Sequence, residues 1–104
     1  MFEFIKSLFR GSSQTLQPVI QKGAIIIDVR TKAEYNQGHV KDSKNIPLNE
    51  IKLKTDIIRS WGKPIITVCR SGNRSGIAKN ILQSNNIESY NGGAWNSFKD
   101  KYAL

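Results

Sequence analysis

Two apolar runs along the chain have the pattern of buried β-strands. Residues 24–29 and 64–68 are apolar and branched with few interruptions, and residues 87–90 are expected to form another short strand. Apolar runs without alternation are typical of strands that are covered on both faces, as in a parallel sheet. A further short strand and a turn are expected between Val40 and the Asn45-Ile46-Pro47 segment. The pattern therefore predicts a small sheet with a central strand over residues 64–68.

Apolar residues at helical spacing occupy the segments around these strands. Helices are predicted over residues 15–22, 31–37, 48–61, 75–84 and 95–102. Because parallel strands need a crossover between them, a helix between two buried strands indicates a βαβ unit. We therefore expect an α/β fold, a three-layer α/β/α sandwich with a mostly parallel sheet and helices on both faces.

Several residues mark the ends of these helices. Thr15 is available as an N-cap, and Thr31 with Glu34 fits a capping box at the start of the second helix. Gly38 is expected to end that helix, and Gly62 the next one. A turn is predicted at residues 91–93, Asn-Gly-Gly, before the closing aromatic helix.

Length and composition indicate one domain without a metal or a cofactor. A chain of 104 residues supports one modest core. The single cysteine excludes an intramolecular disulfide, and with one histidine it cannot form a usual structural zinc site. The net charge of +8 comes from lysines and arginines scattered between Lys6 and Lys101, without clustering beside aromatic residues. A basic surface that attracts small anions is therefore expected, rather than a nucleic-acid site.

The first ten residues carry apolar side chains at helical spacing. Glu3, Lys6 and Arg10 interrupt the stretch, which is too short to span a bilayer, and no small-residue cleavage site follows it. We expect residues 1–14 to be a short helix against the core and a linker, and residues 15–104 to be the domain. The alternative is that the apolar face touches a membrane surface or a partner. These features, with the cysteine usage, predict no transmembrane segment and a cytoplasmic location.

The chemistry is concentrated where the central strand ends. Cys69 follows the strand directly, and residues 70–74 form a small, polar turn before a helix. Backbone N–H groups in such a turn, together with the positive end of the helix, stabilise an anion. If that anion is the Cys69 sulfur, its pKa falls below about 8.5 and a nucleophilic thiolate forms near neutral pH. The alternative is an inert buried cysteine, which does not need two arginines and a glycine behind it.

Residues 69–75, Cys-Arg-Ser-Gly-Asn-Arg-Ser, resemble the active-site loop of small single-domain rhodanese-type sulfurtransferases. Further segments resemble this family in order and spacing from about residue 15 to the end of the chain. They are Asp28-Val29-Arg30, Glu34-Tyr35, Gly38-His39-Val40, Asn45-Ile46-Pro47, and Asn91-Gly92-Gly93 followed by Trp95.

The resemblance implies a double displacement through a persulfide on Cys69. A small anionic donor such as thiosulfate would supply the sulfur, and cyanide, a thiol or a protein would accept it. Backbone N–H groups of residues 70–74 would stabilise the charge. Arg70 and Arg74 would bind the anionic donor, and Gly72 would permit the backbone conformation. The six site residues beside Cys69 are then Arg70, Ser71, Gly72, Asn73, Arg74 and Ser75.

Supporting roles are expected for residues outside the loop. Asp28 and Arg30 flank the end of the first strand and are expected to form a structural ion pair. His39 is the only histidine, and the resemblance implies a structural role for it rather than a Cys–His pair. Ser75 is expected to cap the helix, with a hydrogen bond to the sulfur as the alternative.

Two other functions stay open at this point. The domain could be a binding or sulfur-relay module whose partner is another protein. A cysteine phosphatase or arsenate reductase is the more distant alternative, because those phosphatases place five residues between cysteine and arginine. Four residues separate Cys69 from Arg74, and a shorter loop fits a persulfide sulfur better than a tetrahedral oxyanion. The sequence leaves the oligomeric state and the physiological donor and acceptor open.

Overall fold

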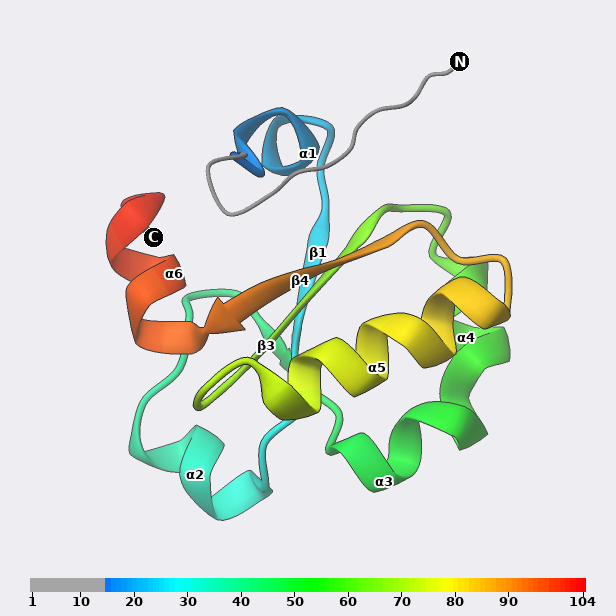
Figure 1. Ribbon diagram of the computed structural model, residues 1–104, viewed down its shortest axis with the longest axis horizontal. Coiled ribbons are helices and arrows are strands. Elements are labelled where there is room, and N and C mark those ends of the chain that lie inside the picture. Colours follow the sequence, from blue (N-terminus) through cyan, green and yellow to red (C-terminus); the bar gives the residue numbers. More distant parts are fainter. Residues whose placement is uncertain (1–14) are drawn as a thin grey trace.

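The structure is a computed structural model that describes residues 15–104 (Figure 1). The predicted N-terminal helix and linker, residues 1–14, lie outside the described residues. Within the described part of the chain, each helix is too short or too polar to cross a membrane.

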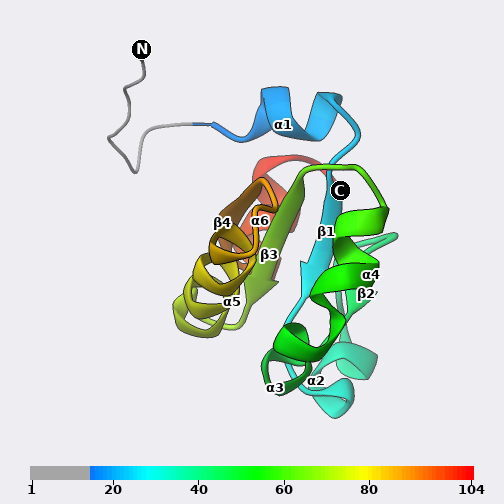
Figure 2. The same ribbon diagram turned by 90° about the vertical axis from the view of Figure 1, so that its right-hand side faces the viewer.

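The sheet has four strands in the order β2-β1-β3-β4. They are β1 (Ile25–Asp28), β2 (Lys44–Asn45), β3 (Ile65–Cys69) and β4 (Ser89–Ala94). All three neighbouring pairs are parallel, with Ile26 opposite Ile66 and Ile66 opposite Tyr90. Figure 2 shows β1 and β3 running side by side towards the end where α2 and α3 lie. The predicted α/β fold with a mostly parallel sheet is confirmed.

The helices connect these strands. They are α1 (Gln17–Gln21), α2 (Lys32–Gln37), α3 (Leu48–Ile51), the 3-10 helix η1 (Lys52–Lys54), α4 (Thr55–Ser60), α5 (Asn73–Ser84) and α6 (Trp95–Lys101). The single helix predicted over residues 48–61 is therefore wrong, since it is divided into three pieces. The break leaves Leu53 84% exposed while Ile51 and Ile58 both reach the core.

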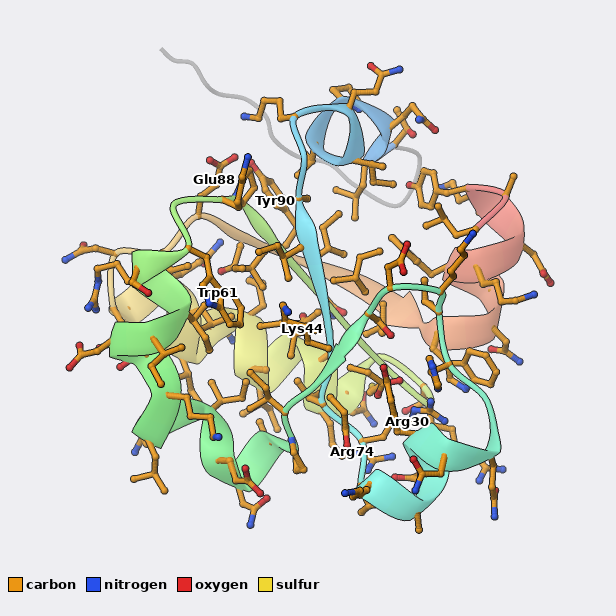
Figure 3. The ribbon with its side chains drawn as sticks, turned by 180° about the vertical axis from the view of Figure 1, so that it is seen from behind. Arg30, Lys44, Trp61, Arg74, Glu88 and Tyr90 are labelled. Atoms are coloured by element: carbon orange, nitrogen blue, oxygen red, sulfur yellow. The ribbon has the colours of Figure 1, made fainter. Side chains whose placement is uncertain are left out.

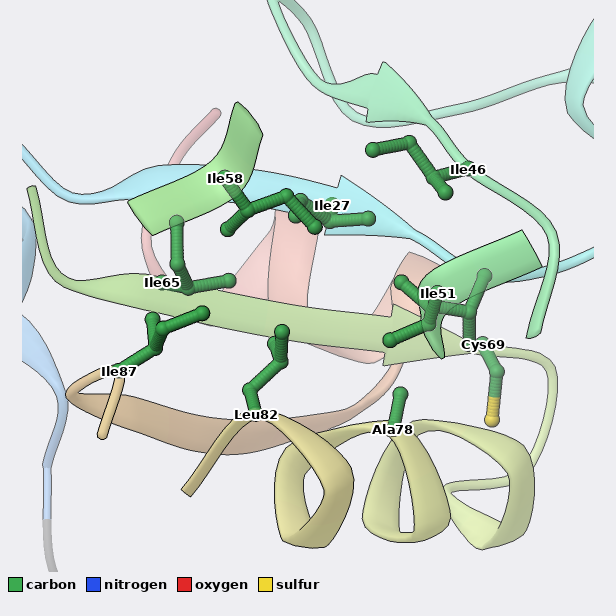
Figure 4. Close-up of a cluster of buried hydrophobic side chains, with 10 residues drawn as sticks. Ile27, Ile46, Ile51, Ile58, Ile65, Cys69, Ala78, Leu82 and Ile87 are labelled. Atoms are coloured by element: carbon green, nitrogen blue, oxygen red, sulfur yellow. The ribbon is translucent and has the colours of Figure 1, made fainter. Parts of the chain in front are cut away.

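Each face of the sheet has its own apolar core. On one face, side chains of α3, α4 and α5 pack on β1 and β3; this cluster contains Ile27, Ile51, Ile58, Ile65, Cys69, Ala78 and Leu82 (Figure 4). On the other face, α1 and α6 contribute Val19 and Phe98, which pack with Ile66 and Val68. Helices thus cover both faces, as predicted, and Cys69 forms part of the first core.

The predicted helix ends are partly confirmed. Thr31 and Glu34 form the capping box of α2, and Gly38 is its C-cap. The N-cap of α1 is Leu16 rather than Thr15, and Pro18 lies in the first turn. The Thr15 hydroxyl still accepts a hydrogen bond from the Gln17 N–H.

The turn predicted at Asn91-Gly92-Gly93 is wrong, since these residues belong to β4. The register between β3 and β4 shifts at Thr67 and Val68, so the strand accommodates an irregularity there rather than ending. A Cβ atom on Gly92 would lie 2.9 Å from side-chain atoms of both Ile66 and Val68. The glycine is therefore needed for close packing against β3, which the dipeptide pattern alone does not reveal.

The strand order places a crevice at the carboxyl ends of β1 and β3. The chain leaves β1 towards β2 on one side and leaves β3 towards β4 on the other. Open parallel sheets bind ligands where such connections diverge. Asp28 ends β1 and Cys69 ends β3, so the predicted site residues meet at this crevice.

Candidate active site

Cys69 lies at the carboxyl end of β3 and is completely buried. Figure 4 shows its sulfur directed from the strand end towards α5, the helix that carries Ala78 and Leu82. The residues that follow, 70–72, make the short connection to the start of α5. The sulfur therefore lies between a buried strand and the N-terminal end of a helix.

The loop directs hydrogen-bond donors at this sulfur. The Gly72 N–H donates to the Cys69 Sγ at 3.0 Å, and the Ser75 Oγ lies 3.3 Å from the same atom. Gly72 has φ +103°, a left-handed conformation that glycine adopts without strain. This conformation turns the loop so that its N–H reaches the sulfur.

These donors decide the acidity of the thiol. Burial alone would raise the pKa of Cys69, but hydrogen bonds from the Ser75 hydroxyl and from the N–H groups of Ser75, Gly72 and Ser71 lower it, and the net shift is downward. The anion that they stabilise is the thiolate, the reactive form of cysteine.

Ser75 does not cap α5, so that prediction is wrong. The N-cap is Gly72, and α5 begins at Asn73. Ser75 lies two residues inside the helix and is completely buried, with its hydroxyl between the Cys69 sulfur and the Asn91 side chain. Because Ser75 lies in the first turn of α5, its hydroxyl lies beside the sulfur. This fits the alternative role, a hydrogen bond to the sulfur.

The two loop arginines have different surroundings. Arg74 donates to both carboxylate oxygens of Glu34, at 2.9 and 3.1 Å. The Arg74 hydrogen bonds, with the N–H of Thr31, lower the pKa of Glu34 from 4.5 to about 2. Arg70 is exposed and, among residues 15–104, makes no ion pair with a carboxylate.

Glu34 is the site residue that the sequence did not reveal. Its capping role was predicted, but its partner Arg74 lies 40 residues further along the chain. A single sequence does not indicate that Glu34 pairs with Arg74, because α2 and α5 meet only in the folded protein.

Asp28 and Arg30 form the predicted ion pair, which is almost completely buried. Arg30 also donates to the Gly38 carbonyl oxygen at 2.6 Å, and its guanidinium lies 4.7 Å from the centre of a Trp95 ring. Figure 3 shows Arg30 and Arg74 at the same end of the sheet, near α2. The pair therefore links the end of β1 to the loop after α2 and to α6.

His39 is held by Tyr35. Its ring stacks on the tyrosine ring with centroids 3.7 Å apart, and its Nδ1 lies 2.7 Å from the Tyr35 carbonyl oxygen. The described contacts of His39 thus tie it to α2 rather than to the Cys69 sulfur.

A cavity of about 380 Å³ opens beside the loop. It is lined by Arg30, Glu34, Gln37, Gly38, Arg70, Trp95 and Asn96. A larger hollow, of about 430 Å³, lies along β4 and α6, and none of residues 69–75 lines it. The smaller cavity is the one that adjoins the candidate chemistry.

The family model of the rhodanese-like domain matches residues 12–101. The chain belongs to the rhodanese-like domain family. The family resemblance stated from the sequence is therefore confirmed, together with the α/β fold.

Two relatives illustrate this membership. The chain is 39% identical over 69 residues to the Bacillus subtilis protein YqhL, covering 65% of this chain and 54% of that protein. It is 39% identical over 57 residues to the Escherichia coli thiosulfate sulfurtransferase PspE, covering 54% of this chain and 55% of PspE. The chain thus spans about half the length of these two relatives.

A solved structure of a rhodanese with anions from Escherichia coli superposes on this fold with a TM-score of 0.63 and 32% identity. The match covers 70% of this chain and 88% of the other. One of the two relatives, PspE, is thus named as a sulfurtransferase, and the solved structure is named as a rhodanese.

Proposed function

We propose that this domain is a sulfurtransferase that carries a sulfane sulfur on Cys69. The observation that carries the proposal is the Gly72 N–H at 3.0 Å from the Cys69 sulfur, at the start of α5. A preorganised donor of this kind stabilises a negative sulfur and needs no proton-transferring residue. The relative PspE, by its name a thiosulfate sulfurtransferase, favours thiosulfate as the donor.

In the first step the Cys69 thiolate attacks the outer sulfur of thiosulfate. A bond forms between the two sulfur atoms, and the bond to the sulfonate sulfur breaks. Its electron pair leaves with sulfite. The product is a persulfide, Cys69–S–S⁻, whose negative charge the N–H groups of residues 70–74 would stabilise.

In the second step a thiophilic acceptor attacks the outer sulfur of the persulfide. The new bond joins that sulfur to the acceptor, and the electron pair of the broken bond returns to Cys69 as a thiolate. Cyanide serves as acceptor in an assay and gives thiocyanate. A thiol or a protein is the acceptor that we propose in the cell, in a reducing compartment such as the cytoplasm, where a lone cysteine stays reduced.

We assign different roles to the two arginines that were expected to bind the donor. Arg70 is exposed and lines the cavity beside the loop, so its guanidinium is available to a donor anion. Arg74 is already engaged by both oxygens of Glu34, and we propose that it mainly holds the loop against α2. Arg70 is therefore the residue through which the donor is recognised.

The other functions have less support. A phosphatase or arsenate reductase would need room for a tetrahedral oxyanion, and only four residues separate Cys69 from Arg74. A pure binding module would have no use for a thiol whose pKa is lowered by four hydrogen bonds. A sulfur relay uses the same persulfide, and differs only in taking sulfur from one protein and passing it to another.

Steady-state formation of thiocyanate from thiosulfate and cyanide tests the proposal. We expect activity in the wild type and none in Cys69→Ser. Arg70→Ala should raise the KM for thiosulfate about tenfold, the effect of losing one charge-assisted hydrogen bond, while Asn36→Ala, an exposed change on α2, should leave it unchanged. Hydrolysis of a generic phosphate ester without sulfur transfer would instead support the phosphatase.

A further inference from the structure

Asn91 of β4 contacts the reactive loop through both ends of its side-chain amide. The Oδ1 accepts hydrogen bonds from the Ser75 hydroxyl at 2.6 Å and from the Gly93 N–H at 2.9 Å. The Nδ2 donates to the Gly72 carbonyl oxygen at 3.1 Å. The opposite orientation of the amide would place its NH₂ group against the Gly93 N–H and its oxygen against the Gly72 carbonyl oxygen, so these two partners fix which end faces Ser75.

The Ser75 hydroxyl has only one proton to donate. In the structure this proton points to Asn91, and the Ser75 oxygen lies 3.3 Å from the Cys69 sulfur. With the proton on Asn91, the oxygen can accept the S–H of a Cys69 thiol. A thiolate has no proton, however, so the hydroxyl must turn its own proton from Asn91 to the sulfur to stabilise it.

We propose that Asn91 is a positioning residue that holds the Ser75 proton away from Cys69 until the sulfur becomes a thiolate. The thiol state then has a chain from S–H to hydroxyl to amide oxygen. In the thiolate state the hydroxyl donates to the sulfur, and the amide keeps its bond from Gly93. Asn91 therefore stabilises the thiol, whereas Ser75 stabilises the thiolate.

The same switch has a consequence for sulfur transfer, and this part rests on the proposed function. In the persulfide the inner sulfur carries neither a proton nor the main negative charge, so the hydroxyl remains on Asn91. When an acceptor removes the outer sulfur, Cys69 leaves as a thiolate and gains the Ser75 hydrogen bond. The bond is made as charge develops, which is the condition for lowering a reaction barrier.

The charged groups around the sulfur are the same in the wild type, in Ser75→Ala, in Asn91→Ala and in the double variant. Arg74 of α5 faces it and is paired with Glu34 of α2, while Asp28 and Arg30 lie at the end of β1. Arg70 is the next residue after Cys69. A difference between the variants is therefore due to the hydroxyl and the amide.

The backbone near Ser75 also has an anchor that does not involve Asn91. The buried Thr67 hydroxyl donates to the Ser75 carbonyl oxygen at 2.8 Å. Asn91 itself is exposed, so its truncation leaves no cavity in the core. The variant Asn91→Ala is therefore expected to fold.

If Asn91 holds the Ser75 proton, the loss of Ser75 and the loss of Asn91 should shift the pKa of Cys69 in opposite directions. Ser75→Ala removes a donor to the thiolate and raises this pKa. Asn91→Ala removes the acceptor that stabilises the thiol arrangement and lowers it. Each shift should be about half a pH unit or more, the size that one hydrogen bond produces. In the double variant the loss of Asn91 should not change the pKa of Cys69 further, because no Ser75 hydroxyl remains for Asn91 to hold.

The experiment is a pH titration of thiolate ultraviolet absorbance on reduced protein without a sulfur donor. Cys69→Ser supplies the background, and Asn36→Ala is the matched control, an exposed asparagine on α2. Asn91→Asp keeps an acceptor and adds negative charge, so it should raise the pKa. Opposite shifts in Ser75→Ala and Asn91→Ala support the switch.

An unchanged or raised pKa in Asn91→Ala would overturn the proposal, since a merely structural role loosens the loop and weakens its donors. The titration needs no persulfide. Its failure would leave the proposed function standing, and a failure to load sulfur would leave the titration result standing.

Discussion

Cys69 combines two opposing effects on its acidity. A completely buried thiol without donors is a weaker acid than one in water, because the charged form loses its hydration. Around Cys69 the Ser75 hydroxyl and the N–H groups of three loop residues replace that hydration, and the pKa falls. Burial and reactivity are therefore compatible at this residue because the Gly72 N–H already donates to the sulfur and the Ser75 hydroxyl lies beside it.

Glu34 gives a pH dependence that can be measured at the scale of one residue. Its pKa of about 2 in the folded chain is below the ordinary 4.5. The folded state favours the charged form, so its contribution to stability is present above about pH 4.5 and is lost as the pH falls towards 2. Glu34→Gln keeps a capping-box residue but not the charge.

We therefore expect Glu34→Gln to lower the free energy of unfolding near neutral pH by about 1 kcal/mol or less, since the pair is partly exposed. The difference from the wild type should shrink as the pH falls from about 6 to about 3. Urea unfolding at both pH values measures it. A difference that is constant across this range would show that the charge of Glu34 contributes nothing.

At the scale of an element, β4 depends on a residue without a side chain. Gly92→Ala would place its Cβ 2.9 Å from Ile66 and Val68 side-chain atoms and 3.0 Å from the Thr67 carbonyl oxygen. We expect it to reduce the free energy of unfolding by about 1–3 kcal/mol, the cost of overpacking.

Thermal unfolding measures this cost, with Gly62→Asn as the control. Gly62 has φ +64° and open space around it, and asparagine tolerates that conformation. Equal stability of Gly92→Ala and the wild type would mean that β4 can move away from β3 without loss.

The elements were predictable where one local signal determines them. The apolar runs predicted β1 and β3, and Thr31 with Glu34 predicted the start of α2. Both signals depend only on residues that are close together in the sequence. The glycines of β4 were misleading, since a pair of glycines is also typical of a turn. Only the approach to Ile66 and Val68 explains them as strand residues.

The candidate site was predictable to the same extent. Cys69 and its loop are contiguous, so their chemistry could be argued from order alone. Glu34 and Asn91 are separated from their partners Arg74 and Ser75 by 40 and 16 residues. Their contacts depend on how α2 and β4 pack beside α5, which follows from the whole fold and not from a local pattern.

At the scale of the whole molecule, charge and topology act together. The parallel sheet brings the ends of β1 and β3 to one crevice, and the chain carries a net charge of +8. A basic protein attracts a dianion such as thiosulfate over a distance that salt shortens, since the screening length is about 10 Å at 0.1 M ionic strength.

We therefore expect kcat/KM for thiosulfate to fall severalfold as sodium chloride rises from about 0.02 to about 0.5 M, because the Debye length shortens across this range. The rate of chemistry from the bound state, kcat, should change less. Steady-state kinetics at fixed pH measure both, and an insensitive kcat/KM would mean that the overall charge plays no part in capturing the donor.

The intact mass of the reduced protein after incubation with thiosulfate tests the central proposal most directly. We expect the wild type to gain the mass of one sulfur atom, Cys69→Ser to gain none, and cyanide to remove the added mass while thiocyanate forms. A folded wild-type sample that gains no sulfur from thiosulfate or from a protein persulfide would contradict a persulfide on Cys69.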